Sequence, residues 1–236
     1  MLSEMEKKKC LFSVSVTGGE PTLFPDFDRI CSILESHDIS FLTINTNGYG
    51  LKRHRERIDG LFDWVNISRH SADDGENDRI FRTHVHSIAE LREIRNGYKK
   101  TKFRIQCVIG NAVHTPDDVL DFMEAYRDVA DDFSFRRLMR TGEEFGLDYT
   151  VNSDEYFRLL DYAYENWTFR EQAIQDYYVY EIWNDGKSDI TFSYSDMKLV
   201  RDTEGTEDDS IFREFICHPD GTISGSWRKD CKIILE

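Results

Sequence analysis

Hydrophobic and polar residues alternate with a period of two in five stretches of the chain, and the segments between these stretches show a helical period. Strict alternation predicts a half-buried strand, whereas apolar residues at i, i+3, i+4 and i+7 predict one face of a helix. The predicted strands are 11–16, 39–45, 63–68, 102–109 and 132–139. The predicted helices between them are 27–37, 51–60, 87–97 and 115–126, with a polar loop at 73–78.

This succession of strands and helices predicts an α/β fold. Strands that alternate with helices form a parallel sheet with right-handed crossovers, either open or closed into a partial (βα) barrel. We assign residues 1–140 to this βα core and residues 141–236 to a C-terminal α+β extension. The extension is predicted to hold a helix from Ser153, a helical aromatic stretch from Trp167 to Trp183, a strand at 188–194 and a hairpin around residues 218–221.

Composition restricts the class of protein further. The 236 residues carry a net charge of −15, which disfavours nucleic acid as a partner because phosphate binding needs Lys and Arg. No apolar run approaches the roughly 18 residues of a membrane span, and the polar start does not resemble a secretory signal. The five cysteines are odd in number, widely spaced and without a CxxC pair. We therefore expect a cytoplasmic protein in a reducing compartment and no membrane partner.

The first predicted strand runs directly into Gly18-Gly19-Glu20-Pro21, and a helix follows. Two glycines allow a backbone turn that other residues resist and a close approach to a ligand. Glu20 then lies at the carboxyl end of a strand, where α/β folds place ligands, and its carboxylate suits an ammonium group. The alternative is a tight turn whose glutamate is merely solvated.

The other predicted strands also end in polar residues. These ends are Thr46-Asn47, Ser68-Arg69, Gly110-Asn111 and Arg136-Arg137. Since parallel strands end at one mouth of a barrel, the set is suited to a zwitterionic amino acid with a ribose and a base. Arg69 would bind a carboxylate, and Thr46, Ser68 and Asn111 would bind hydroxyls or ring edges. Exposure alone would also explain any single polar strand end.

The segment from Thr17 to Pro21 resembles the GGEP motif of the radical S-adenosylmethionine (SAM) superfamily. Residues 42–48, 66–70 and 108–111 resemble the later strand segments of the same family, in the same order. The resemblance implies a SAM site made of Gly18, Gly19, Glu20, Thr46, Asn47, Ser68, Arg69 and Asn111. It also implies a [4Fe-4S] cluster that cleaves SAM reductively to a 5′-deoxyadenosyl radical.

The chain departs from the family pattern at the cluster ligands. A CxxxCxxC loop is expected about one βα unit, on the order of 30 residues, before Gly18. The residues before Gly18 hold only Cys10, and a cluster needs several thiolates. We expect that the N-terminus is truncated, with a cluster-free relative as the alternative. No residue is assigned as a metal ligand or as catalytic.

Three functions remain open. The first is a radical SAM enzyme with an unknown small-molecule or peptide substrate and an electron donor. The second is a non-catalytic module that binds SAM, a nucleotide or a partner, and the third is a phosphate-binding barrel enzyme, which lacks a glycine-rich phosphate loop here. Cys217 and Cys231 are too few for an auxiliary cluster, so their segment is interpreted as a simple hairpin. His84 and His86 are interpreted as solvated rather than as a metal pair.

Overall fold

The computed structural model describes residues 1–8, 12–110, 112–137, 153–175, 178–195, 215–218, 220–225 and 233–235. The chain forms two compact units. The first comprises Met1–Ala173 with Tyr180–Tyr194, and the second comprises Ile174–Val179 with Ser195–Glu236. The boundary predicted at residue 140 lies outside the described residues and stays a prediction.

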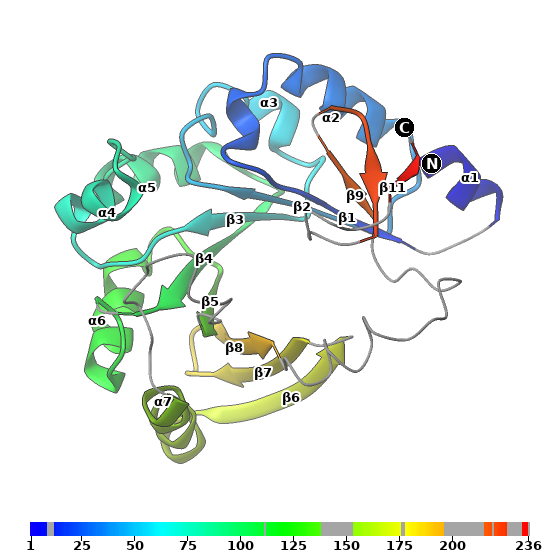
Figure 1. Cartoon of the computed structure of the whole chain (residues 1–236). Helices are drawn as coiled ribbons and strands as arrows, with labels where there is room; N and C mark the ends of the chain where they lie inside the picture. Colours follow the sequence, from blue (N-terminus) through cyan, green and yellow to red (C-terminus); the bar gives the residue numbers. More distant parts are fainter. Residues whose placement is uncertain are drawn as a thin grey trace. The chain divides into compact units, whose positions relative to one another are not determined.

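An eight-stranded sheet organises the larger unit. Its strands in spatial order are β1 (Ser13–Val16), β2 (Phe41–Thr46), β3 (Trp64–Ser68), β4 (Lys102–Ile109), β5 (Asp132–Arg137), β8 (Asp189–Ser195), β7 (Tyr178–Asn184) and β6 (Thr168–Gln175). From β1 to β5, and from β5 to β8, neighbouring strands are parallel. The sheet curls into a half-barrel (Figure 1), which confirms the predicted α/β partial barrel.

Helices cover the outer, convex side of the curled sheet (Figure 1). The helical segments are α1 (Leu2–Lys7), η1 (Pro21–Leu23), α2 (Phe27–Glu35), α3 (Arg55–Ile58), α4 (Asp74–Phe81), α5 (Ile88–Gly97), α6 (Pro116–Tyr126) and α7 (Ser153–Asn166). Ser87 forms the predicted capping box with Glu90 at the start of α5, and Thr115 caps α6 as predicted. Each cap satisfies backbone N–H groups that a helix leaves unpaired.

Two predicted elements were wrong. Residues 73–78 are not a loop, because Asp73 caps the helix α4 by accepting a hydrogen bond from the Glu76 amide. Acidic side chains in its first turn also favour this helix through its dipole. The stretch from Trp167 to Trp183 is not helical but forms β6 and β7. Aromatic and β-branched residues favour a strand once a neighbouring strand is present, and β7 pairs between β6 and β8.

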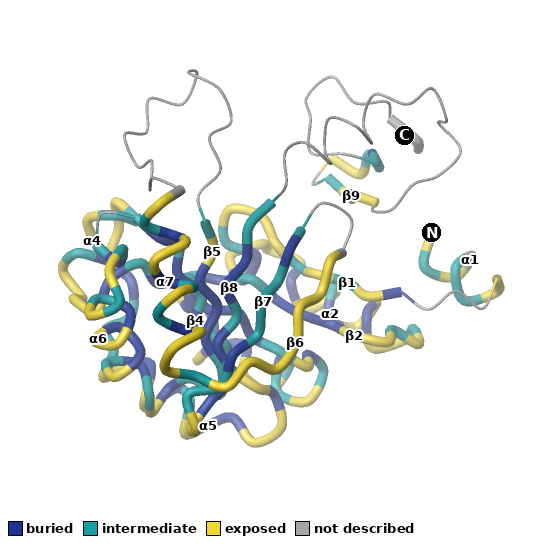
Figure 2. The backbone as a smooth tube through the Cα atoms, turned by 90° about the horizontal axis from the view of Figure 1, so that it is seen from below, coloured by how far each residue is buried: buried dark blue, intermediate teal, exposed yellow. Residues whose placement is uncertain are grey.

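The hydrophobic core lies between the sheet and its helices. Phe103, Ile105, Phe133 and Phe135 project from β4 and β5, and all of them are fully buried. Phe122 of α6 packs against both phenylalanines of β5, with ring centroids 6.5 Å and 5.7 Å away. Figure 2 shows buried residues along the middle strands of the sheet, from β2 to β5 and in β8, whereas β6 is exposed at the edge of the sheet.

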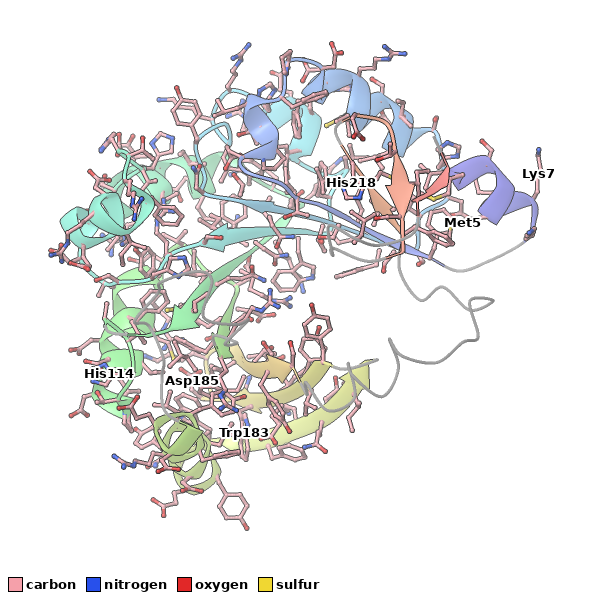
Figure 3. The ribbon with its side chains drawn as sticks, viewed as in Figure 1. Met5, Lys7, His114, Trp183, Asp185 and His218 are labelled. Atoms are coloured by element: carbon pink, nitrogen blue, oxygen red, sulfur yellow. The ribbon has the colours of Figure 1, made fainter. Side chains whose placement is uncertain are left out.

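The last three strands of the sheet are tied to the helices by specific side chains (Figure 3). Trp183 of β7 makes an edge contact with Tyr164 of α7, at a centroid distance of 6.3 Å. Asp185, in the turn after β7, accepts a hydrogen bond of 2.8 Å from Arg127. The predicted strand at 188–194 is confirmed as β8.

The smaller unit holds a three-stranded antiparallel sheet of β9 (Ile216–Cys217), β10 (Ile223–Ser224) and β11 (Ile233–Leu235). The hairpin predicted around residues 218–221 is confirmed, since β9 pairs with β10 and His218 donates its backbone N–H to Thr222. None of the helices that the structure describes combines the length and the apolar character needed to cross a membrane.

Candidate functional site

The predicted site residues lie at the carboxyl ends of three neighbouring strands. Gly18 and Gly19 follow β1 and are exposed, with Glu20 half-buried beside them. The end of β2 supplies Thr46 and Asn47, and the end of β3 supplies Ser68 and Arg69. Because β1, β2 and β3 are parallel neighbours, these ends lie along one edge of the sheet. Asn111 lies outside the described residues.

The Glu20 carboxylate joins the ends of β1 and β2. Its Oε1 accepts hydrogen bonds from Thr22 N at 3.0 Å, Thr22 Oγ1 at 2.6 Å and Thr46 Oγ1 at 2.8 Å. Its Oε2 accepts a bond of 2.7 Å from the backbone N–H of Asn47. Protein donors therefore hold the carboxylate in one orientation while part of it stays exposed, as a preformed cation site requires.

The turn before Glu20 leaves open space. Gly18 has a φ of 150°, in the region that L side chains rarely adopt. A Cβ added at Gly18 or Gly19 would meet nothing within 4 Å, so no side chain fills the space over this turn. The exposed glycine backbone therefore leaves open space beside the anchored Glu20 carboxylate.

Arg69 lies behind this edge rather than on it. Its side chain is 0% exposed, and its Nη atoms donate to the carbonyls of Asn47 at 2.8 Å, Ser68 at 2.7 Å and His86 at 3.0 Å. Burial lowers the pKa of this guanidinium. The predicted bond between Arg69 and a ligand carboxylate therefore has no exposed donor in this arrangement. The visible role of Arg69 is to hold the end of β2, the end of β3 and the start of α5 together.

His70 was not singled out from the sequence. The backbone N–H of Val108 donates to its Nδ1 at 3.1 Å, so the neutral ring must carry its proton on Nε2. The imidazole stacks on Phe81, with centroids 5.3 Å apart, and its own backbone N–H donates to Asn77 Oδ1. Burial, and then the charge of Arg69, lower the pKa of His70 to about 4. It is therefore a neutral group at the junction of β3 and β4.

The concave face of the sheet carries polar side chains in registered rows below the strand ends. The register places Asn45, Asn66, Arg104 and Asp132 in one row, and Ser68, Gln106, Ser134 and Thr191 in the next. The signal was present in the sequence as the polar half of each alternating strand. The sequence did not reveal these rows, because a polar residue at every second position of a strand faces away from the core but can face either open solvent or a concave polar surface.

The described residues do not fit a [4Fe-4S] cluster. No group of three or more His, Cys, Asp or Glu among them is arranged to hold a metal ion. Burial raises the pKa of the Cys31 thiol to about 11 and also raises that of Cys107, which disfavours the thiolate that iron requires. Cys10 and Cys231 lie outside the described residues. We therefore derive no step through a cluster.

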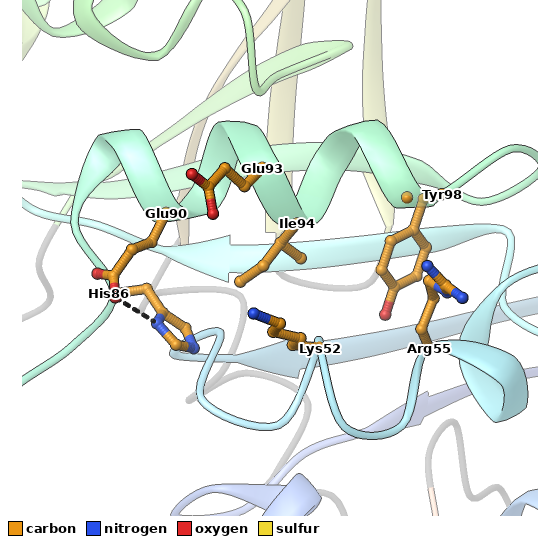
Figure 4. A pocket seen from close by; sticks show the side chains of 8 residues that line it. Lys52, Arg55, His86, Glu90, Glu93, Ile94 and Tyr98 are labelled. Carbon is orange, nitrogen blue, oxygen red and sulfur yellow. Dashed lines mark ion pairs between the residues drawn. The ribbon is translucent and has the colours of Figure 1, made fainter.

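His84 and His86 make separate contacts. His84 Nδ1 lies 2.9 Å from the Asp78 carboxylate, which raises the pKa of His84. His86 Nδ1 lies 3.8 Å from Glu90 in a surface groove between α5 and residues 52–55 (Figure 4). Glu90 and Glu93 of α5 line one side of this groove, and Lys52 and Arg55 line the other (Figure 4). Such mixed charge does not select a ligand of one sign.

Comparison with known proteins relates the chain to one family. A family model described as the Radical SAM superfamily matches residues 1–144. A GTP 3′,8-cyclase from Actinobacillus pleuropneumoniae serotype 5b is 30% identical over 177 residues, which cover 69% of this chain and 48% of the relative. An S-adenosylmethionine-dependent nucleotide dehydratase from a Thermoplasmatales archaeon is 25% identical over 91 residues, which cover 36% of this chain and 33% of the relative.

Solved structures agree on the fold. Streptococcus suis SuiB bound to S-adenosylmethionine superimposes with a TM-score of 0.55 at 20% identity, over 69% of this chain and 36% of SuiB. SuiB bound to its precursor peptide SuiA gives a TM-score of 0.54 at 19% identity, over 69% of this chain and 37% of that one. The chain thus spans less than half the length of these relatives.

Proposed function

Because the chain belongs to the radical SAM superfamily, we propose that the ends of β1, β2 and β3 bind SAM. The observation that carries this proposal is the Glu20 carboxylate, fixed by protein donors and left partly exposed beside the open turn at Gly18 and Gly19. The SAM ammonium would lie at Glu20, where a charge-assisted hydrogen bond replaces solvent.

The remaining predicted residues take different parts in this proposal. Thr46 and the backbone of Asn47 orient Glu20, and the half-buried Ser68 is placed to meet a hydroxyl of the ligand. Arg69 holds the strand ends from behind rather than touching the ligand. Asn111 stays a predicted contact to the base.

We further propose that the whole protein is an enzyme that uses SAM to transform a nucleotide. The names of its sequence relatives, a GTP 3′,8-cyclase and a nucleotide dehydratase, favour this class of substrate. The described residues contribute binding and orientation, and an electron donor is an implied partner.

Calorimetric titration with SAM tests the site. The Glu20→Gln variant keeps the shape of the side chain but removes its charge, so SAM affinity is expected to fall by about tenfold or more. Glu35→Gln, at the exposed end of α2, is the matched control and is expected to bind SAM as the unmodified chain does. Equal affinities for both variants would refute the assignment.

A second measurement separates an enzyme from a non-catalytic binding module. Anaerobic incubation of the whole protein with SAM and a reductant, after bound iron and sulfide have been measured, is expected to release 5′-deoxyadenosine. SAM binding without release would leave the module as the correct function.

A further inference from the structure

Thr22 holds one oxygen of the Glu20 carboxylate from inside the protein. It follows Glu20 by two residues, lies in the short helix η1 and is only 3% exposed. Its backbone N–H donates to Glu20 Oε1 at 3.0 Å, and its hydroxyl donates to the same oxygen at 2.6 Å. Because two donors of one buried residue meet one acceptor, the position of Oε1 is fixed by Thr22 rather than by solvent.

The donors divide unequally between the two oxygens of Glu20. Oε1 accepts both bonds from Thr22, whereas Oε2 accepts the backbone N–H of Asn47 at 2.7 Å. The Thr46 hydroxyl lies 2.8 Å from Oε1 and 2.9 Å from Oε2, and the Gly48 N–H donates to it, so its own hydrogen points at the carboxylate. A carboxylate oxygen accepts about two hydrogen bonds, so Oε1 is saturated and Oε2 has room for a further donor.

The charge of Glu20 is left available to a ligand. The donors that these contacts bring to it are backbone N–H groups and hydroxyls, all of them neutral. Dipoles orient a carboxylate without cancelling its negative charge, and half-burial strengthens the attraction between that charge and a cation. A cationic donor such as a primary ammonium is therefore favoured at Oε2 over a neutral one.

Gly50 provides the space that Thr22 occupies. A Cβ added at Gly50 would collide with the Cβ and Oγ1 of Thr22, and both residues are buried. The clash involves the branch point of Thr22 rather than a flexible end, so a larger residue at position 50 must displace it. Gly50 lies in the turn after β2, the same segment that supplies Thr46 and Asn47 to the carboxylate. The glycine thus couples the two segments that hold Glu20.

We propose that Thr22, seated against Gly50, is a positioning residue of the proposed SAM site, where it occupies Glu20 Oε1 and directs the ligand ammonium to Oε2. The inference rests on the proposed function and deepens it, because it assigns the ammonium to one oxygen and names the residues that keep the other oxygen closed. Thr22 acts through Glu20 and does not touch the ligand. Its contribution should therefore vanish when the carboxylate is removed.

Calorimetric titration with SAM on variants of the full chain tests this coupling. Thr22→Val removes the hydroxyl, keeps the branched shape and the backbone donor, and is expected to weaken SAM binding about fivefold. Thr22→Ser restores the hydroxyl and is expected to restore the affinity. In a Glu20→Ala background, Thr22→Val is expected to change the affinity by less than about twofold, since its route to the ligand is gone.

Thr101→Val is the matched control. Thr101 is 2% exposed, and its hydroxyl bonds to backbone carbonyls just before the amino end of β4, at the opposite edge of the sheet. This variant is expected to lose stability as Thr22→Val does and to bind SAM as the unmodified chain does. A loss of SAM affinity caused by instability alone would appear in both variants and would overturn the inference.

Amide hydrogen exchange measures the positioning without SAM. The Asn47 N–H donates to Oε2, so release of the carboxylate by Thr22→Val or Gly50→Ala is expected to speed exchange at Asn47 about threefold or more, with Ile105 in β4 unchanged. If Gly50→Ala does not fold, Thr22→Val alone decides the result. Faster exchange in a chain that does not bind SAM would refute the proposed function and support the positioning of Glu20 for another cation. Unchanged exchange at Asn47, or undiminished SAM affinity of Thr22→Val in a chain that binds SAM, would overturn the inference.

Discussion

The two faces of the parallel strands differ completely although they share one backbone. On the convex face, the odd-numbered positions of β4 from Phe103 to Ile109 are all buried against α5 and α6. On the concave face, the next residue along each time is polar or half-exposed, as in Arg104 and Gln106. The first face supplies the stability of the fold, and the second supplies the chemistry. Substitutions on the two faces should therefore change different quantities.

The sharpest test compares two adjacent residues of β4. Ile105→Ala removes a fully buried side chain from the convex face and is expected to lower the free energy of unfolding by about 4 kcal/mol. Gln106→Ala, on the concave face, is expected to change it by less than about 1 kcal/mol. Urea denaturation followed by circular dichroism measures both. Similar losses for the two variants would mean that the concave face is also structural.

A second test compares an arginine from each face. Arg69→Met leaves three backbone carbonyls without their charged donor, so the free energy of unfolding is expected to fall by about 3 kcal/mol. Arg104→Met is expected to cost about 1 kcal/mol or less, because Arg104 is half-exposed and its Asp132 partner lies 3.5 Å away. If Arg104→Met proved the more destabilising, Arg104 would serve the fold rather than a ligand.

The smallest change in stability at neutral pH is expected at His70, which lies between β4 and α4. Its pKa is about 4 in the folded chain, below the value of about 6.5 for a free histidine. The unfolded chain therefore binds the proton first, and stability falls as the pH drops from about 6.5 to 4, by at most roughly 1.4 kcal/mol per unit.

His70→Asn removes this titration and keeps an acceptor for the Val108 N–H. The difference in unfolding free energy between the variant and the unmodified chain is expected to be flat above pH 6.5 and to shift in favour of the variant below it. Denaturation at several pH values measures this difference. A difference that did not change with pH would show that the folded imidazole is protonated as easily as the unfolded one.

The sequence predicted the convex face better than the rest of the molecule. Regular spacing of residues such as Phe103, Ile105 and Val119 identified strands and helices, because burial on one side imposes a period. The capping box of Ser87 and Glu90 was also predictable, because its two residues lie only three positions apart in the sequence. The stretch from Trp167 to Trp183 failed because its aromatic residues fit either a helix or a strand, and the neighbouring strand decided. Asp73 is an N-cap residue whose presence would have predicted the helix α4, but it was interpreted as part of a loop.

The sequence predicted that the residues at the strand ends lie close together, but it did not predict their contacts. Parallel strands bring Glu20, Thr46 and Asn47 together whatever their side chains do, so their proximity followed from the fold class. The bonds of Arg69 did not, because they depend on carbonyls from three segments that only the folded chain brings together. The polar rows escaped for the same reason, since their members are far apart in the sequence and meet only through strand register.

The strand order has a consequence for how the chain assembles during synthesis. Each strand from β2 to β5 pairs with the strand made immediately before it, so these strands can pair one after another as they leave the ribosome. β5 then pairs with β8, whereas β6 and β7 emerge earlier. The outer edge of β5 therefore keeps its backbone groups unpaired in the nascent chain until β8 has been made. This interval is when a holding chaperone would help most and when aggregation between nascent chains is most probable.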